Sequence, residues 1–259
     1  MDLIKFLRLP IVASAHGQDI DFIIYVIHIL MLVLFIGWGA FYIYVLLRFN
    51  QRANPKANYH GVHSHASSAI EIALGVLEAI LLVGFSIPFW AKQVNAFPQR
   101  TDTVEVRVVA EQFAWNIHYP GPDGIFGKTD IKYFDKQANP LGIDPNDTNG
   151  KDDFTTINQL HLPIGRPAII YLTSKDVIHC FGLNVMRVKQ DVIPGLSIPT
   201  WFTPTKTGQF EIACAQLCGI GHYSMRGFLT IHSQEDYDKW AAEQSSAKGT
   251  EGGGDSFWN

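Results

Sequence analysis

Two long apolar stretches separated by a polar loop occupy the first 92 residues of the chain. The stretch from Phe22 to Leu47 carries no charged residue. At about 1.5 Å per residue, a helix of this length crosses the hydrocarbon core of a bilayer with room for tilt. The second stretch, 66–91, is interrupted only by Glu71 and Glu78. The pair predicts a transmembrane helical hairpin within 1–92, with spans at about 22–47 and 66–91.

From residue 103 onward the pattern changes to short, β-branched runs. The segment 104–110 alternates, and later apolar runs are separated by Gly or Pro. Short runs with frequent turn signals predict an all-β sandwich or barrel over 93–245. A short helix is expected at 233–243, followed by a flexible tail at 246–259. The runs that we expect to form the later strands are QLHLP, PAIIYLT, NVMRVK, TWFTP, GQFEIAC and GFLTIH.

An insert at 121–153 is long for a connection between strands and is rich in Asp, Gly, Pro and Asn. Its acidic spacing does not fit a calcium-binding EF-hand loop, because Thr148 stands where a ligand is required. We therefore expect a hydrophilic surface excursion.

The charge pattern argues against nucleic acid as a partner and indicates on which side of the membrane the loop and the β-domain lie. The net charge is −4 and no long basic tract is present, so nucleic acid is not an expected partner. The loop between the apolar stretches carries Arg48, Arg52 and Lys56, which favours a cytoplasmic loop and an outer location for the β-domain. That domain is modestly acidic, which suits a basic partner but is explained equally well by solvation.

The candidate chemistry lies in the cysteines and their neighbours. Three cysteines cannot all pair as disulfides, and no C-x-x-C-H run for covalent haem is present. Soft sulfur together with imidazole selects copper or zinc, and a methionine is a familiar weak axial ligand of electron-transfer copper but a poor ligand of zinc. The pattern therefore favours copper. The decisive run is Cys214-Ala-Gln-Leu-Cys218-Gly-Ile-Gly-His222-Tyr-Ser-Met225.

Two coppers that share both thiolates need a second imidazole. His179 lies 35 residues before Cys214, between two strand-like segments, and would give each metal two sulfurs and one histidine. Met225 and a backbone carbonyl, that of Gln216, would be the weak axial ligands. Cys180 is expected in the core. The remaining histidines of the β-domain are expected on strand surfaces or in the core, namely His118, His161 and His232.

These motifs together resemble cytochrome c oxidase subunit II along nearly the whole chain. The helical hairpin, the segment Ser174–His179, the segment Arg187–Gly195 and the cysteine loop follow in that family's order. The resemblance implies an α+β membrane protein, with the helical hairpin followed by a cupredoxin-like β-barrel. It implies a binuclear copper centre, CuA, that takes electrons from cytochrome c and delivers them to haem in subunit I. The implied ligands are His179, Cys214, Gln216 through its main-chain oxygen, Cys218, His222 and Met225.

Two departures from the family pattern affect these expectations. The residue between the cysteines is usually glutamate, which reaches a magnesium ion shared with subunit I. The neutral amide of Gln216 is a weaker ligand for a hard cation and leaves magnesium doubtful as a cofactor. The aromatic run usually begins with tryptophan, whereas this chain has Phe113 before Trp115. We expect electron entry near Phe113, Trp115 and Asp176, from a cytochrome c or a tethered cytochrome c domain.

The two membrane carboxylates suggest a proton pathway. Glu71 resembles the family's entry carboxylate for protons, and Glu78, seven residues on, lies on nearly the same helix face. The alternative for Glu78 is that it is protonated and hydrogen-bonded to a neighbouring helix.

The whole pattern predicts an electron-transfer subunit of a proton-translocating terminal respiratory oxidase in the bacterial inner membrane. Its partners would be subunit I, other oxidase subunits and the bilayer. No complete active site, and no catalytic residue, is expected in this chain alone. The alternative is a membrane-anchored copper chaperone, which would show a thioredoxin-like βαβ pattern and would not need Met225.

Overall fold

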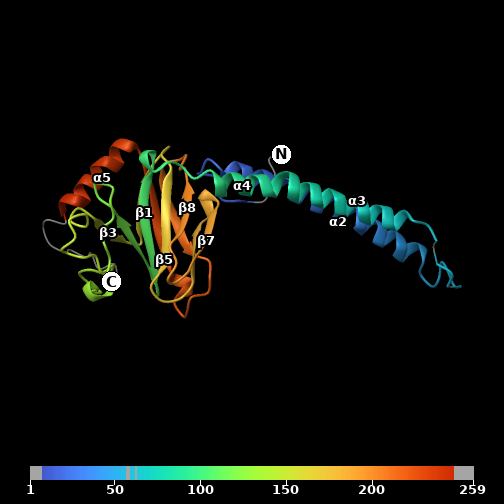
Figure 1. Ribbon diagram of the computed structural model, residues 1–259. Coiled ribbons are helices and arrows are strands. Elements are labelled where there is room, and N and C mark those ends of the chain that lie inside the picture. The colour runs from blue at the N-terminus through green and yellow to red at the C-terminus, as the bar shows by residue number, and fades with distance from the viewer. Residues whose placement is uncertain (1–7, 57–58, 62, 248–259) are drawn as a thin grey trace. The chain divides into compact units, whose positions relative to one another are not determined.

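The chain forms a helical unit and a β unit in the computed structural model, which describes residues 8–56, 59–61 and 63–247 (Figure 1). The helical unit includes Gln18–Ala96, and the β unit consists of Pro10–Gly17 and the chain from Phe97 onward. Most of the expected tail, from residue 248 on, lies outside the described residues.

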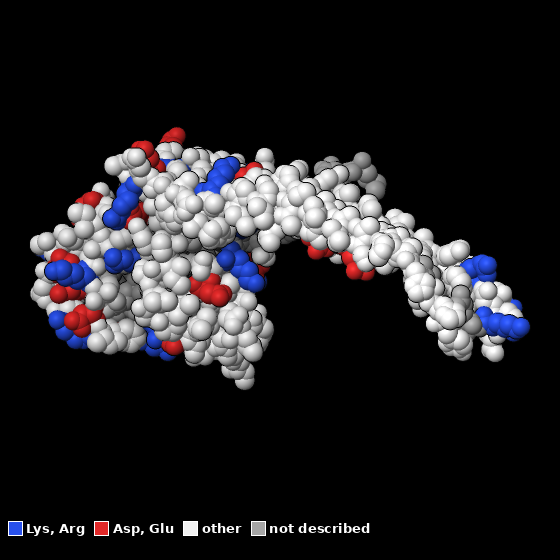
Figure 2. All heavy atoms as spheres, turned by 45° about the vertical axis from the view of Figure 1, so that its right-hand side comes forward, with Lys and Arg blue, Asp and Glu red and all other residues white. Residues whose placement is uncertain are grey.

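The helical unit consists of α2 (Gly17–Arg48) and a second long helix built from α3 (Ala66–Leu81), η1 (Leu82–Ser86) and α4 (Ile87–Asn95). By length and composition both helices can cross a membrane, with mean hydropathies of 2.5 and 2.2. Most of their large apolar side chains are exposed. In Figure 2 the helical unit is largely white, with blue groups at its loop end. Such a surface is suited to lipid or to other membrane helices.

The second span is not a regular α-helix throughout. Residues Leu82–Ser86 form a π-helical turn, and α4 has a proline, Pro88, in its first turn. Proline lacks a backbone N–H and its ring clashes with the carbonyl four residues earlier. A wider turn before Pro88 relieves that clash. The apolar pattern predicted the extent of the helix but not this change of geometry.

The β unit contains two five-stranded sheets (Figure 1). The first has the order β3-β2-β1-β5-β8 and the second has the order β4-β10-β9-β6-β7. Strands β1 and β5 are parallel, as are β4 and β10, and the other pairs are antiparallel. The strands are β1 (Val104–Glu111), β2 (Ala114–Tyr119), β3 (Phe154–Ile157), β4 (Gln159–Pro163), β5 (Ala168–Ser174), β6 (His179–Leu183), β7 (Val188–Val192), β8 (Ile198–Phe202), β9 (Gly208–Cys214) and β10 (Arg226–His232).

The core follows from the alternation that the sequence displays. Every second residue of β1 is buried, beginning at Val104, because successive side chains of a strand point to opposite faces. Fully buried residues of both sheets, such as Val108, Leu172 and Ile212, belong to one cluster. This confirms the predicted β fold. One strand prediction was wrong, because NVMRVK is divided: Asn184–Met186 forms a 3-10 turn and Arg187 has a left-handed φ of 56°.

A short N-terminal segment completes the β unit. The side chain of Ala13 is fully buried, and its N–H donates to the carbonyl of Val185 at 2.8 Å. Ser14 Oγ donates to the carbonyl of Met186 at 2.6 Å, and the Thr205 N–H donates to the Ala13 carbonyl. The expected first domain, 1–92, therefore differs from the structure, because this segment pairs with Val185, Met186 and Thr205 of the β unit.

Helix α5 (Gln234–Ala247) covers a pair of histidines at one end of the β unit. The ring of Trp240 stacks on His161 with centroids 4.1 Å apart and an interplanar angle of 10°. His161 Nδ1 lies 2.7 Å from His232 Nε2, so the two imidazoles share one hydrogen bond. The hydroxyl of the neighbouring Tyr119 accepts a hydrogen bond from the backbone N–H of His161 at 2.7 Å. Docking of α5 therefore buries an imidazole pair.

We predict that α5 is held less firmly as the pH falls from about 6.5 to 4. Burial, and then the proximity of His232, lower the pKa of His161 to about 4 from 6.5. The undocked state consequently binds more protons in this window, so docking is complete above it and weakens within it. Hydrogen exchange of α5 amides, corrected for intrinsic rates, should accelerate. His161→Phe should flatten this dependence, and an unchanged slope would contradict the prediction.

Candidate metal centre

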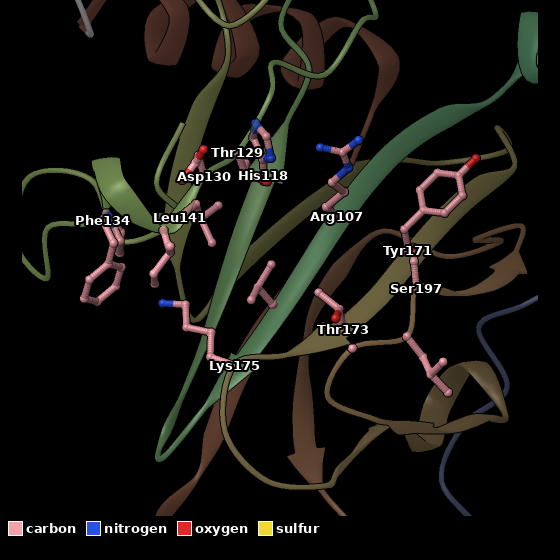
Figure 3. Close-up of a pocket in the computed structure, with 15 residues that line it drawn as sticks. Arg107, His118, Thr129, Asp130, Phe134, Leu141, Tyr171, Thr173, Lys175 and Ser197 are labelled. Atoms are coloured by element: carbon pink, nitrogen blue, oxygen red, sulfur yellow. The ribbon is translucent and has the colours of Figure 1, made fainter. Parts of the chain in front are cut away.

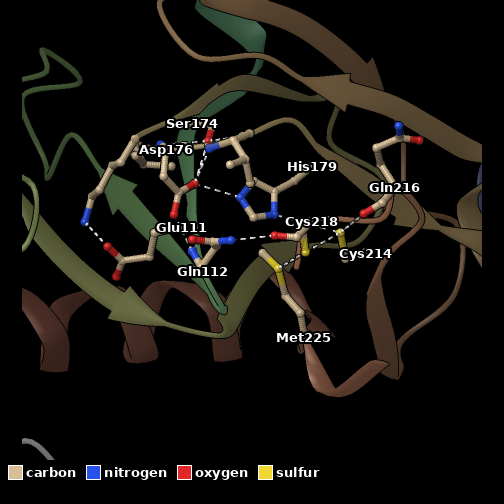
Figure 4. Close-up of polar contacts among 12 residues, drawn as sticks. Glu111, Gln112, Ser174, Asp176, His179, Cys214, Gln216, Cys218 and Met225 are labelled. Carbon is tan, nitrogen blue, oxygen red and sulfur yellow. Dashed lines mark hydrogen bonds and ion pairs between the residues drawn. The ribbon is translucent and has the colours of Figure 1, made fainter. Parts of the chain in front are cut away.

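Strand pairing brings together the two halves of the predicted metal site. His179 is the first residue of β6, and Cys214 is the last residue of β9. These strands pair with Phe181 opposite Cys214, which places His179 beside the loop that follows β9. That loop ends at Met225, immediately before β10. Figure 4 shows the side chains of these segments converging.

The side chains form a compact cluster of soft donors. Cys214 Sγ lies 3.8 Å from Cys218 Sγ and 3.9 Å from His179 Nδ1. Cys218 Sγ lies 3.6 Å from His222 Nδ1 and 3.8 Å from Met225 Sδ. The sulfur separation is far longer than a disulfide bond. Within the described part of the chain, His179, Cys214 and Cys218 form the one group of at least three His, Cys, Asp or Glu ligands within 4.8 Å of one another.

Burial shows why this cluster suits a cation. His179 is fully buried, and Cys218 and Met225 are only 4% and 2% exposed. Burial, together with the hydrogen bond to Cys214, raises the pKa of the Cys218 thiol to about 11. Two adjacent thiolates are therefore unfavourable here without a positive charge between them. The donor set of two thiols, two imidazoles and a thioether fits copper.

Cys180 differs from the other two cysteines. It follows His179 on β6, so its side chain points to the opposite face of the strand. It is 1% exposed, and burial raises the pKa of its thiol to about 11. The prediction of a core cysteine is confirmed.

Asp176 holds His179 in the orientation that the cluster needs (Figure 4). His179 Nε2 donates to Asp176 Oδ1 at 2.9 Å, which leaves Nδ1 facing Cys214. Burial opposes ionisation of Asp176, but hydrogen bonds from His179 and from the N–H groups of Gln112 and Val177 lower its pKa overall. A carboxylate behind a histidine fixes the ring and its tautomer. The spacing of Asp176 and His179 was the sequence signal for this contact.

The two aromatic residues predicted near electron entry have different environments. Trp115 is fully buried, and its ring lies edge-on to His179 and Phe181, with centroid distances of 6.2 and 5.5 Å. Phe113 is partly buried and packs against the core. Trp115 is therefore an internal neighbour of the cluster, whereas Phe113 lies nearer the surface.

Phe113 and Gln112 support the cysteine loop from the side. Gln112 Nε2 donates to the Cys218 carbonyl at 2.6 Å. A Cβ at Gly221 would lie 2.7 Å from Phe113 Cγ and Cε2, and Gly219 has φ +136°, which an L side chain rarely adopts. The sequence interpretation gave these glycines no role, although the Gly-x-Gly spacing between Cys218 and His222 was the available signal.

The remaining residues singled out in the sequence have different surroundings in the structure. Gln216 is exposed, and its main-chain oxygen lies 3.2 Å from Cys214 Sγ. Glu71 and Glu78 are exposed residues of α3 in the helical unit. His118 is a core residue whose Nε2 lies 2.6 Å from Asp153 Oδ2.

The chain is similar to known proteins of one family. Residues 104–231 match the family model described as cytochrome c oxidase subunit II, periplasmic domain. The alternative cytochrome c oxidase subunit 2 of Bradyrhizobium diazoefficiens is 33% identical over 214 residues, which cover 82% of this chain and 75% of that protein. The cytochrome c oxidase subunit 2 of Synechocystis sp. is 27% identical over 257 residues, covering 92% and 76%.

A solved structure of the same family also aligns with the chain. It is the periplasmic domain of subunit II of cytochrome oxidase from Bradyrhizobium japonicum, with 27% identity and a TM-score of 0.42. The alignment covers 57% of this chain and 96% of that one.

Two apolar helices followed by a cupredoxin-like β-domain with a soft-donor cluster define a membrane-anchored electron-transfer protein with a periplasmic domain. The chain belongs to the cytochrome c oxidase subunit II family. Members of this family are subunits of haem–copper oxidoreductases, and their domain carries the binuclear copper centre CuA. Between the described strands β1 to β10 no α-helix forms the crossover that the βαβ pattern of the alternative copper chaperone requires.

Proposed function

We propose that this chain receives electrons from a cytochrome c-type donor for a terminal oxidase in the bacterial inner membrane. The electrons pass to haem in subunit I for the reduction of oxygen to water, coupled to proton translocation. Two coppers, when bound, supply a redox centre that shares one electron. The residues that hold them are His179, Cys214, Gln216 through its main-chain oxygen, Cys218, His222 and Met225.

The observation that supports this proposal best is the arrangement of donors around two neighbouring sulfurs. Each sulfur has its own imidazole, since His179 faces Cys214 and His222 faces Cys218. The thioether of Met225 lies on the Cys218 side, and the carbonyl of Gln216 lies on the Cys214 side. This pattern provides two equivalent positions and would be redundant for a single ion.

We predict two coppers per chain and a delocalised mixed-valence signal in electron paramagnetic resonance. The full chain should be used, because a fragment beginning at residue 93 would lack Ala13 of the core. Cys214→Ser and Cys218→Ser should abolish the signal. Met225→Leu should keep both coppers and shift the midpoint potential, because a weak axial ligand tunes the metal. One copper with a four-line hyperfine pattern would refute the binuclear site.

For the docking of the donor, the exposed apolar side chains of the cysteine loop are the best candidates. Leu217, Ile220 and Tyr223 are 78%, 93% and 90% exposed, and they alternate with the proposed ligands along the loop. Exposed apolar groups beside a polar surface are typical of an interaction site. Phe113 and Trp115 lie behind this patch as aromatic contacts toward His179, and Asp176 orients that ring.

We predict that Ile220→Ser slows electron transfer from the donor by roughly three- to tenfold, because the variant removes an apolar contact. The copper spectrum should not change, since the side chain points into solvent. Ile157→Ser, an exposed isoleucine of β3, is the matched control and should have no effect. Asp176→Asn is a poorer test of charge steering, because its carboxylate also binds His179. Equal rates in both isoleucine variants would exclude this patch.

Protons enter, in this proposal, through the second membrane helix. Glu71 and Glu78 both lie on α3 and are exposed in the isolated chain, so they are available to face subunit I. Seven residues correspond to about 10 Å along a helix and two nearly complete turns. Glu71 admits protons, and Glu78 extends the relay. Ionisable groups at membrane depth usually face protein or water.

We predict that Glu71→Gln lowers turnover of the assembled oxidase, because an amide cannot carry a proton through the entrance. Glu78→Gln should lower turnover less if Glu78 only extends the pathway. Oxygen consumption and haem content should be measured together, so that an assembly defect is recognised. Full turnover of Glu71→Gln with normal assembly would refute the entry role, and a silent Glu78→Gln alone would make that residue structural.

A further inference from the structure

A cavity lies over the outer face of the first sheet (Figure 3). Its floor is formed by residues of β1 and β5, including Arg107, Tyr171 and Thr173. The insert 121–153 supplies one wall through Phe134 and Leu141, and the loop 195–197 supplies the other. The cavity has a volume of about 530 Å³, within the range of small-molecule sites.

The insert is anchored over the sheet by specific contacts. The ring of Phe126 lies 4.1 Å from the Arg107 guanidinium carbon and 5.1 Å from the His118 ring. Asp153 Oδ2 accepts a hydrogen bond from the Gly127 N–H at 2.8 Å and lies 2.6 Å from His118 Nε2. The side chains of His118 and Asp153 are both buried. The insert is therefore a fixed wall of the cavity, and not merely the hydrophilic excursion that the sequence suggested.

Arg107 is a half-buried cation with no ion-pair partner among the described residues. Its nearest polar contact is a long one, from Nη1 to the Gly127 carbonyl at 3.5 Å. Burial lowers the pKa of Arg107 more than the charges of Asp153, Tyr171 and Glu105 raise it. Glu105 forms its ion pair with Arg100 instead. A positive charge held in such a place is stabilised by an anion that enters the cavity.

The other charges at the cavity are already neutralised. Lys175 Nζ binds Glu111 at 2.8 Å, and Asp130 pairs with Lys132 at 3.4 Å. Among the described Lys, Arg, Asp and Glu residues of the lining, Arg107 is therefore the one without a direct ion pair. A guanidinium presents parallel N–H donors that match a carboxylate in a bidentate geometry.

The remaining walls are apolar and accessible. Phe134 and Leu196 are 42% and 51% exposed and lie on opposite sides, with Val109 on the floor. A ligand that fills this space needs an apolar body as well as one negative charge.

We propose that this cavity binds a compact organic acid, with its carboxylate on Arg107 and an aromatic or alicyclic body between the insert and loop 195–197. This site is independent of the copper centre and of the proposed electron transfer. In this proposal, the insert 121–153 forms one wall of a ligand site.

The proposal can be tested by calorimetric titration of 2-naphthoate into the full chain in lipid nanodiscs, with empty nanodiscs as the blank. Saturable binding of one molecule per chain is expected. The uncharged 2-naphthamide should bind at least about tenfold more weakly, because it lacks the charge that Arg107 recognises. Arg107→Gln should weaken naphthoate binding roughly ten- to hundredfold, the usual effect of removing a charged hydrogen bond.

Two further variants distinguish loss of the site from loss of the fold. Leu196→Glu changes an exposed residue on the opposite wall and should also weaken binding, by repulsion and loss of apolar contact. Lys136→Gln removes an exposed charge of the insert outside the cavity lining and should bind as the unmodified chain does. All variants should retain the copper signal. Absence of saturable binding, equal binding of the amide, or unchanged affinity in both cavity variants would overturn the proposal.

Discussion

The pairing of β6 with β9 is the constraint on which the metal centre depends. It sets Phe181 opposite Cys214, and because His179 lies two residues before Phe181, its ring must face the cysteine loop. The sandwich core holds both strands from behind, through Phe181 and Ile212. A donor set assembled in this way does not need the metal to bring its parts together, so the protein can keep the ligand positions constant as the electron arrives and leaves.

The loop itself combines rigid and exposed parts. Its interior side is anchored by the hydrogen bond of Gln112 to Cys218 and by the ring of Phe113 against two glycines. Its outer side presents Leu217, Ile220 and Tyr223 to solvent. The run from Cys214 to Met225 thus combines the proposed ligands with an exposed apolar surface, because the ligands and the exposed side chains alternate along the loop.

The two faces of the first sheet have different surroundings. The inner face of β1 contributes to the core, whereas its outer face carries Arg107 and Val109 beneath the insert. The insert that covers the outer face is anchored to the sheet near its two ends, which form a fixed base. Phe126 and Asp153 provide that fixed base here.

The sequence alone determined the features that depend on local pattern. Long apolar stretches indicated the two spans, alternation indicated most strands of the sandwich, and the spacing from Cys214 to Met225 indicated the soft-donor loop. Tertiary structure decided the rest, because contacts between distant residues leave no local periodicity. Ala13 belongs to the core of a domain that begins almost 90 residues later, and Arg107 lies beneath an insert whose sequence indicated only exposed turns. The aromatic run left open how far Trp115 lies from the surface, and the structure buries it beside His179, since only the packing of two sheets determines which face of β2 is enclosed.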